Sequence, residues 1–177
     1  KTMLKATVGP SADMVARYRF VTKGEEIFGY YSGNSFANQL GISMQVPRKI
    51  EIVSNNSNSS PREIEIGGRK FLIRKSSIVI NRENVYVLQL LELLKNIEVY
   101  MDGSYDEARV KIEEYIDIHD IRKESVNRYI REFPINVFKN YYDWGWTMYL
   151  HKENKELFRD IISIVSERKN VTTDIVE

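Results

Sequence analysis

Residues 62–75 read REIEIGGRKFLIRK, and this stretch predicts a β-hairpin. Two runs rich in β-forming residues flank Gly67-Gly68, a dipeptide that favours a two-residue type I′ turn. In that register Glu65 lies opposite Lys70 and Ile64 lies opposite Phe71. An exposed ion pair and a buried apolar pair therefore both form, and cross-strand pairs of this kind add roughly 0.2–1 kcal/mol each.

The residues before the hairpin predict two helices and two strands. Ser11 is placed to cap a helix that ends before Lys23-Gly24, and Met14, Val15, Tyr18 and Val21 recur along it at helical spacing. An apolar and aromatic run predicts a strand over 27–31, and Gly41 ends a short helix over 35–40. Polar and apolar residues alternate over 49–53, which indicates a strand with one buried face. The polar stretch 54–61 predicts a loop.

The residues after the hairpin are predominantly helical. Residues 77–80 can add one more strand, and Asn81 then caps a helix over 82–96. The apolar positions of this helix cover so much of its surface that we expect it to be central; they are Val85, Val87, Leu88, Leu90, Leu91, Leu93 and Leu94. Further helices are predicted near 105–117, 122–131, 135–150 and 153–168, with breaks at Gly103, His119-Asp120, Phe133-Pro134 and Lys152.

The predicted fold class is α+β. We expect a small β-sheet with a hairpin at about 49–80, accompanied by short helices and followed by a helical C-terminal half. Residues 1–100 form the α+β core domain in this interpretation, and residues 101–177 form a helical segment packed on the same domain. A chain of 177 residues suits that size.

Composition narrows the class of protein. Apolar residues make up 42% of the chain and charged residues 29%. No apolar run approaches the roughly 18 residues that a membrane span needs, and no leader sequence is present, so we expect a cytoplasmic protein without a membrane partner. The chain has no cysteine and two histidines, His119 and His151. It therefore predicts neither a metal site nor a cofactor.

Charge is unevenly distributed, although the net charge is +1. Residues 47–83 hold eight Lys/Arg against four Asp/Glu, whereas residues 84–120 hold three against nine. The basic segment predicts contacts with the phosphates of duplex DNA or, alternatively, a solvated strand edge. The acidic segment predicts a solvated helix face or a docking surface for a basic partner. The candidate phosphate-contacting residues are Arg48, Lys49, Arg62, Arg69, Lys70, Arg74 and Lys75.

Aromatic residues concentrate in YYDWGWTMYL at 141–150. Tyr141, Trp144 and Met148 have the spacing of a helix face, which favours core packing over stacking on bases or anchoring of a partner.

No catalytic motif is present. The chain lacks phosphate-binding loops and the pattern of a nucleophilic triad. Glu51, Glu63 and Glu65 fall in predicted strands, but the lysine that a metal-dependent nuclease places two residues after its acid is missing. We therefore expect a binding module and no enzyme. The alternative is a degenerate nuclease or nucleotidyl-handling domain.

Residues 29–47, GYYSGNSFANQLGISMQVP, extend this interpretation. Together with RKIEIVSN at 48–55, the hairpin, and ENVYVLQLLELLKNI at 83–97, they resemble the AbiEi-type antitoxin family of type IV toxin–antitoxin and phage abortive-infection systems. The resemblance covers about residues 10–97 and continues more loosely through SVNRYIREFPINVFKNYYDWG at 125–145.

The resemblance implies a regulatory function. Members of that family typically carry an N-terminal winged helix-turn-helix that binds their own promoter, followed by a domain that takes part in neutralising a nucleotidyltransferase-like toxin. Only about thirty residues precede the motif here, and the chain begins at Lys1. We therefore expect the C-terminal domain of such an antitoxin, with the cognate toxin as partner and with promoter recognition and autoregulation as properties of the longer protein.

Two roles are open to residues 29–47. Gly33 and Gly41 suit a positive φ, Asn34 and Ser35 can cap a helix, and Pro47 favours an extended chain into the next strand. These features predict a structural corner of strand, turn, helix and strand. The alternative is a recognition loop that uses Tyr30, Tyr31, Ser32, Asn34, Asn38 and Gln45.

Overall fold

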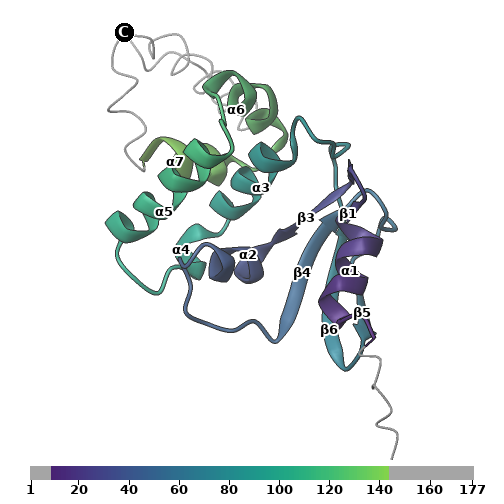
Figure 1. Cartoon of the computed structure of the whole chain (residues 1–177). Coiled ribbons are helices and arrows are strands. Elements are labelled where there is room, and N and C mark those ends of the chain that lie inside the picture. Colours follow the sequence, from purple (N-terminus) through teal and green to yellow (C-terminus); the bar gives the residue numbers. More distant parts are fainter. Residues whose placement is uncertain (1–8, 144–177) are drawn as a thin grey trace, which may run out of the picture.

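The computed structural model describes residues 9–143. The helix predicted at 153–168, the end of the one predicted at 135–150, Trp144, Met148 and the break at Lys152 lie outside the described residues. Within them the fold is α+β, as predicted: a four-stranded sheet lies between one helix on one face and a group of helices on the other (Figure 1).

The four strands lie in the order β3-β4-β6-β5. They are β3 Gly29–Ser32, β4 Lys49–Ser54, β5 Arg62–Ile66 and β6 Arg69–Lys75. β4 and β6 are parallel, and the two edge strands are antiparallel to their neighbours. The predicted hairpin register is confirmed, with Glu65 opposite Lys70 and Ile64 opposite Phe71. Gly67 and Gly68 have φ values of 55° and 77°, as a type I′ turn requires.

Helix α1, Ala12–Phe20, covers one face of the sheet. Ser11 caps it as predicted, because its hydroxyl accepts the amide hydrogen of Met14. Ala16 and Phe20 are its buried residues, and they pack with Ile50, Ile52, Phe71 and Ile73 of the sheet. Met14 and Tyr18 are 63% and 54% exposed. Met14 and Tyr18 are therefore not on the buried face of this helix, whereas Val21 is partly buried against this cluster. β1 Thr22–Lys23 and β2 Glu26–Ile27 follow as a small hairpin.

Helices α2, Gly33–Gln39, and α3, Val85–Leu94, lie on the other face. All seven apolar residues predicted to be buried in α3 are buried. The helix starts three residues later than predicted, because the Asn81 side chain accepts the amides of Glu83 and Asn84 and holds a separate turn. Residues 77–80 form no strand. Asn55 instead pairs through its side-chain amide with both backbone groups of Ile80.

The corner predicted for residues 29–47 is confirmed, because strand β3 turns into helix α2 and the chain then leads into strand β4. Gly33 makes the turn with a φ of 58°, where a side chain is rarely accommodated. The predicted capping by Asn34 and Ser35 is wrong, because Ser32 occupies the N-cap. The Ser35 hydroxyl accepts the Glu51 amide hydrogen and donates to the Lys49 carbonyl, so it ties α2 to β4.

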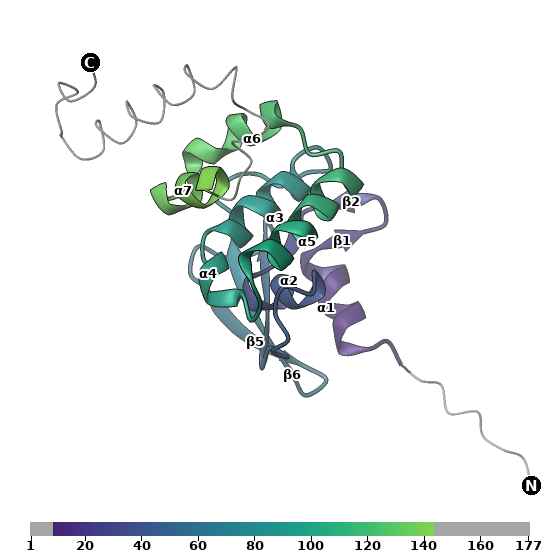
Figure 2. The same ribbon diagram turned by 90° about the vertical axis from the view of Figure 1, so that its left-hand side faces the viewer.

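The helical half comprises four α-helices and one 3-10 helix up to residue 143 (Figure 2). Their bounds are α4 Ile97–Tyr100, α5 Tyr105–Ile118, α6 Lys123–Tyr129, η1 Ile130–Glu132 and α7 Ile135–Asp143. Helix α4 was not expected. The predicted breaks near Gly103, His119-Asp120 and Phe133-Pro134 are present, and Ser104 and Glu107 form a capping box at the start of α5.

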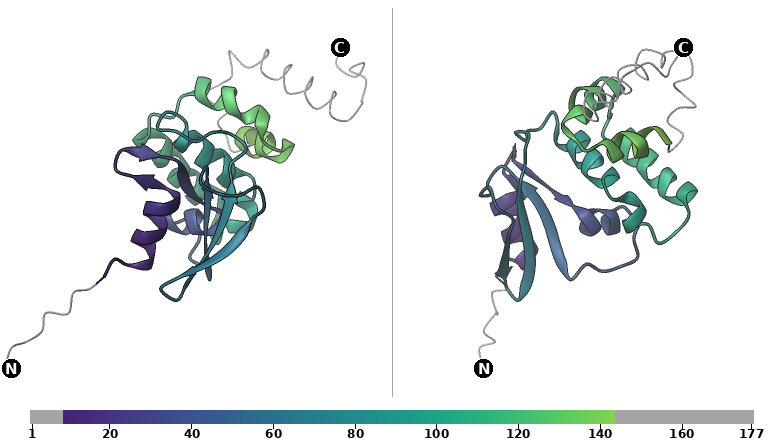
Figure 3. Two further views of the ribbon diagram at one scale, coloured as in Figure 1. Left: turned by 90° about the vertical axis from the view of Figure 1, so that its right-hand side faces the viewer. Right: turned by 180° about the vertical axis from the view of Figure 1, so that it is seen from behind.

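The two halves share one hydrophobic core, which runs from Tyr30 to Tyr142. Side chains of helix α7 also donate hydrogen bonds to the backbone carbonyls at the end of α3. The Asn140 amide donates to the Leu94 carbonyl at 2.7 Å, and the Asn136 amide donates to the Lys95 carbonyl at 2.6 Å. The last carbonyls of a helix lack partners within it, so these amides stabilise the docking of α7. The β5–β6 hairpin projects away from this half (Figure 3).

None of the helices within residues 9–143 combines the length and apolar character needed to cross a bilayer.

We predict that Gly29→Ala strongly destabilises the fold. A Cβ atom at this position would overlap the Phe20 carbonyl oxygen and lie 2.8 Å from the Val53 carbonyl oxygen. Both are backbone atoms, so α1 or β4 must move. The expected loss is about 3 kcal/mol of unfolding free energy, measured by urea denaturation. The control is Gly9→Ala, where nothing lies within 4 Å of an added Cβ. Equal stability of the two variants would contradict this account of the packing.

Candidate functional site

The seven candidate phosphate-contacting residues do not gather on one surface. Side chains alternate between the two faces along each strand. The register therefore directs Arg62, Arg69 and Lys75 to the face covered by α1, and Lys49, Lys70 and Arg74 to the opposite face. We call these the α1 face and the α3 face. Arg48 is exposed and immediately precedes β4.

Several of these cations are matched within the fold. On the α1 face, Arg69 forms an ion pair with Asp13, and the Arg62 guanidinium lies 5.8 Å from the centre of the Phe20 ring. On the α3 face, Lys49 pairs with Glu63, and Arg74 pairs with Glu92 and Glu51. Within residues 9–143, the cations of this set without a carboxylate partner are Arg48, Arg62, Lys70 and Lys75, and Arg62 has only the Phe20 ring as a partner.

Arg74 is the centre of a partly buried network of charged groups. One guanidinium nitrogen donates to Glu92 Oε1 at 2.9 Å, and the other donates to Ser32 Oγ at 3.0 Å and lies 3.5 Å from Glu51 Oε2. Lys95 Nζ approaches the same Glu92 oxygen at 3.7 Å. The network joins β6 to the corner through Ser32, to β4 through Glu51 and to α3 through Glu92.

The surroundings shift the pKa values of this network. Burial lowers the pKa of Arg74, but the charge and hydrogen bond of Glu92, together with the charge of Glu51, raise it above its ordinary value. Burial raises the pKa of Glu51; the charge of Arg74 opposes this, and the charge of Glu92 adds to it. Burial and the negative charge of Glu92 also raise the pKa of the adjacent Tyr30. Arg74 therefore stays charged, and Tyr30 stays neutral.

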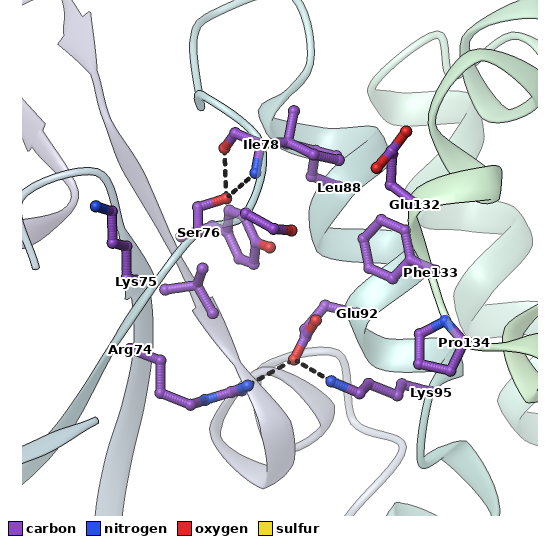
Figure 4. A pocket seen from close by; sticks show the side chains of 13 residues that line it. Arg74, Lys75, Ser76, Ile78, Leu88, Glu92, Lys95, Glu132, Phe133 and Pro134 are labelled. Atoms are coloured by element: carbon purple, nitrogen blue, oxygen red, sulfur yellow. Dashed lines mark hydrogen bonds and ion pairs between the residues drawn. The ribbon is translucent and has the colours of Figure 1, made fainter. Parts of the chain in front are cut away.

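A pocket of about 150 Å³ opens beside this network, between the sheet and the helical half (Figure 4). Arg74, Glu92 and Lys95 form its charged floor, and Ser76 and Ile78 come from the segment that follows β6. Glu132, Phe133 and Pro134 form the wall toward η1 and α7. The pocket offers cations and carboxylates side by side, which suits a polar group with both a donor and an acceptor.

The six recognition-loop candidates are largely internal. Tyr30 and Ser32 are 4% and 1% exposed, and Tyr31 and Asn34 are half-buried. Asn38 donates its side-chain amide to the Ser43 carbonyl. The remaining candidate, Gln45, is exposed and donates to Asp102 Oδ1 at 3.1 Å.

Asp102 holds the loop between α2 and β4. Its other carboxylate oxygen accepts from the Met44 amide at 2.7 Å and from the Ser43 hydroxyl at 3.1 Å. The Met44 hydrogen bond, followed by those of Ser43 and Gln45, lowers the pKa of Asp102 below its usual range. Most of the six candidate side chains in residues 29–47 are therefore buried or hydrogen-bonded within the protein.

The carboxylates of the enzyme alternative share the α3 face but do not converge. Glu51 and Glu63 flank Leu72 in one cross-strand row, and each is paired with a different cation. Glu65 is exposed and lies opposite Lys70. Among residues 9–143, no three His, Asp or Glu side chains lie together as a metal site would need.

Sequence reasoning did not single out Glu92, Gln89 or Asp102. Glu92 and Gln89 interrupt an otherwise apolar helix, VYVLQLLELL, and a polar residue on a largely buried helix requires a partner. The sequence therefore shows that these two side chains need partners, but it does not show which residues those partners are. The partners of Asp102, on the loop after α2, lie 57 to 59 residues away along the chain.

We predict that Arg74→Ala destabilises the fold by about 2–3 kcal/mol, because it leaves Glu92 and Glu51 partly buried without their cation. Urea denaturation measures the loss. Lys75→Ala is the matched control: Lys75 is the next residue, exposed and without an ion pair among the described residues, and the expected change is within about 0.5 kcal/mol. An equal effect of both substitutions would show that the network contributes nothing specific.

A second prediction concerns pH. The pKa of Glu51 is raised in the folded chain, so folding favours its protonated form. This contribution to stability is present below the ordinary glutamate pKa and is lost as pH rises through the raised value. Glu51→Gln should therefore gain stability relative to wild type between about pH 4 and pH 7. Denaturation at both pH values measures the difference, and a difference that stays constant would contradict the prediction.

No protein-family model, curated protein or solved structure shows a significant match to this chain. The family resemblance rests on the motif residues quoted from the sequence.

Proposed function

We propose that this chain is the partner-binding domain of an antitoxin of the AbiEi type, which acts in the cytoplasm and neutralises a nucleotidyltransferase-like toxin. The observation that carries the proposal is the uncovered half of the α3 face. Helix α2 packs on β3 and β4, and α3 packs on β3, whereas α1 covers β4, β5 and β6 from the opposite side. Apart from Arg74, which contacts Glu92 of α3, the α3 face of the β5–β6 hairpin is therefore left open by the elements of residues 9–143.

This open patch consists of Lys49, Glu63, Glu65, Lys70 and Leu72. Leu72 is half-buried and the four charged residues are exposed. Lys49 and Glu63 form an ion pair, and Glu65 and Lys70 are cross-strand neighbours. Opposite charges alternate around one aliphatic side chain. That pattern favours a protein surface of complementary charge over the uniformly negative backbone of a nucleic acid.

The patch adjoins an edge of the sheet. β5 is an edge strand, so one side of its backbone makes no β-ladder hydrogen bonds with the strands of residues 9–143. An extended segment of the toxin could add to this edge while its side chains contact the patch. The corner at residues 29–47 supports this arrangement, because its buried residues position β4 beside the hairpin and none of them belongs to the patch.

A contribution to promoter binding is a secondary proposal. It rests on Arg48, Lys70 and Lys75, which are exposed and have no carboxylate partner within residues 9–143. Each phosphate that they neutralise would add about 0.9 to the slope of log affinity against log salt concentration. Mobility shifts of the full-length protein on promoter DNA, with and without the three residues changed to alanine, measure that slope. An unchanged slope removes these residues from the DNA contact.

We predict that Leu72→Asp and Lys70→Glu each weaken toxin binding by about tenfold or more, because both place an unmatched charge in the patch. Co-expression with the product of the adjacent gene measures relief of growth arrest, and co-purification measures binding. The controls make the same changes on α5, at Val110→Asp and Lys111→Glu, where the side chains are exposed.

Urea denaturation checks that the four variants remain folded. Lys70→Glu keeps the test valid if Leu72→Asp is unstable, since Lys70 is exposed. Loss of rescue by the patch variants alone supports the proposal. Failure of the unaltered full-length protein to relieve the arrest would refute the antitoxin function, and equal loss in the α5 variants would refute the patch.

A further inference from the structure

A second pocket, of about 300 Å³, lies away from the open patch. Its lining residues come from α1 and the β1–β2 hairpin, from β3, and from α2, α3 and the end of α5. Figure 2 shows how these helices and the β1–β2 hairpin are arranged. Its volume is at the lower end of the range for small-molecule sites. A ligand of one or two rings fits such a space, whereas a dinucleotide does not.

The wall of this pocket is aromatic. The rings of Tyr86 and His119 stack with their centres 3.7 Å apart. Tyr115 meets His119 edge-on at 4.5 Å, and Phe36 meets Tyr115 edge-on at 5.2 Å. Tyr31 completes the aromatic lining. Stacked and edge-on ring contacts thus line one wall of the pocket, and another aromatic ring packs well beside such rings.

The polar groups at the back of the pocket already form hydrogen bonds with each other. Gln89 donates its amide to the Tyr31 carbonyl at 2.8 Å and accepts from the Tyr115 hydroxyl at 2.8 Å. Burial lowers the pKa of His119, so its ring is neutral at pH 7. A ligand therefore meets a closed hydrogen-bond network at the back of the pocket and does not need to satisfy buried groups there.

Among the described residues that line the pocket, Arg17 carries the one formal charge. It is exposed on α1 and forms no ion pair with any carboxylate of residues 9–143. An unmatched guanidinium beside an aromatic wall favours a ligand that carries a negative group next to a ring.

We propose that this pocket binds a small planar aromatic anion, with the ring against Tyr86, His119 and Tyr115 and the anionic group at Arg17. Two sources share this chemistry: an aromatic carboxylate and a nucleoside monophosphate. The proposal is independent of the toxin-binding patch, because no patch residue lines the pocket.

The test follows the His119 ring by NMR in the whole chain. His119 and His151 are the two histidines of the sequence, and His151→Gln identifies their signals. The probes are indole-3-acetate as an aromatic carboxylate, AMP as a nucleotide, indole as a neutral ring, and acetate as an anion without a ring. We expect saturable shifts of the His119 signal with indole-3-acetate or AMP, and the stronger of the two identifies the source.

Two matched pairs of variants locate the ligand. Arg17→Ala should weaken binding about fivefold, as loss of an exposed charge contact does, whereas Arg19→Ala on the same helix should not, since Arg19 does not line the pocket. Tyr86→Ala should weaken binding further, and Tyr18→Ala, at an exposed tyrosine of α1, should not.

Three results would overturn the proposal. The first is the absence of a saturable shift with either anionic ring at millimolar concentration. The second is equal binding by Arg17→Ala and the wild type, which would remove the role of the anion. The third is an equal shift with acetate alone, which would remove the role of the ring.

Discussion

Helix α3 is the element on which the rest of the structure depends, because it is buried and its polar groups therefore need partners inside the protein. Each partner comes from a different element. Gln89 contacts β3 and α5, Glu92 contacts β6, and the last carbonyls accept from α7. The leucines of α3 provide hydrophobic stabilisation without direction, whereas these hydrogen bonds specify how the sheet and the helices are oriented around it.

The excess of basic residues in one stretch of the sequence does not produce a basic surface on the folded protein. The basic stretch 47–83 alternates between two faces of a sheet, and folding brings acids from α1, α3 and β5 to its cations. What remains on the α3 face is a mixed pattern around Leu72. The same principle explains Arg74, which lies in a basic run of the sequence but functions inside the protein as a connection between two carboxylates.

The elements that could be predicted from sequence are those whose information is local. The hairpin register follows from Gly67-Gly68 and the flanking alternation, and the buried positions of α3 follow from its leucines. Properties set by distant residues were missed. The buried face of α1 is Ala16 and Phe20 because the sheet lies there, and residues 77–80 stay irregular because Asn55 pairs with Ile80. The site was predicted least well, since the seven cations are visible in the sequence but the acidic partners of Lys49, Arg69 and Arg74 are not.

The strand order has a consequence for how the molecule assembles. β6 lies between β4 and β5 in the sheet, although β5 comes between β4 and β6 in the sequence. The parallel β4–β6 pair therefore forms across a connection that contains the edge strand β5. A hairpin closes within about 1–10 µs, whereas parallel pairing across a longer connection is slower. We expect β5 and β6 to form first as a unit and then to dock against β4 together, an order that pulsed hydrogen exchange would detect as earlier protection of the hairpin amides. The folding rate of this sheet would then be set by the docking of the preformed hairpin onto β4, and not by the sequential addition of single strands.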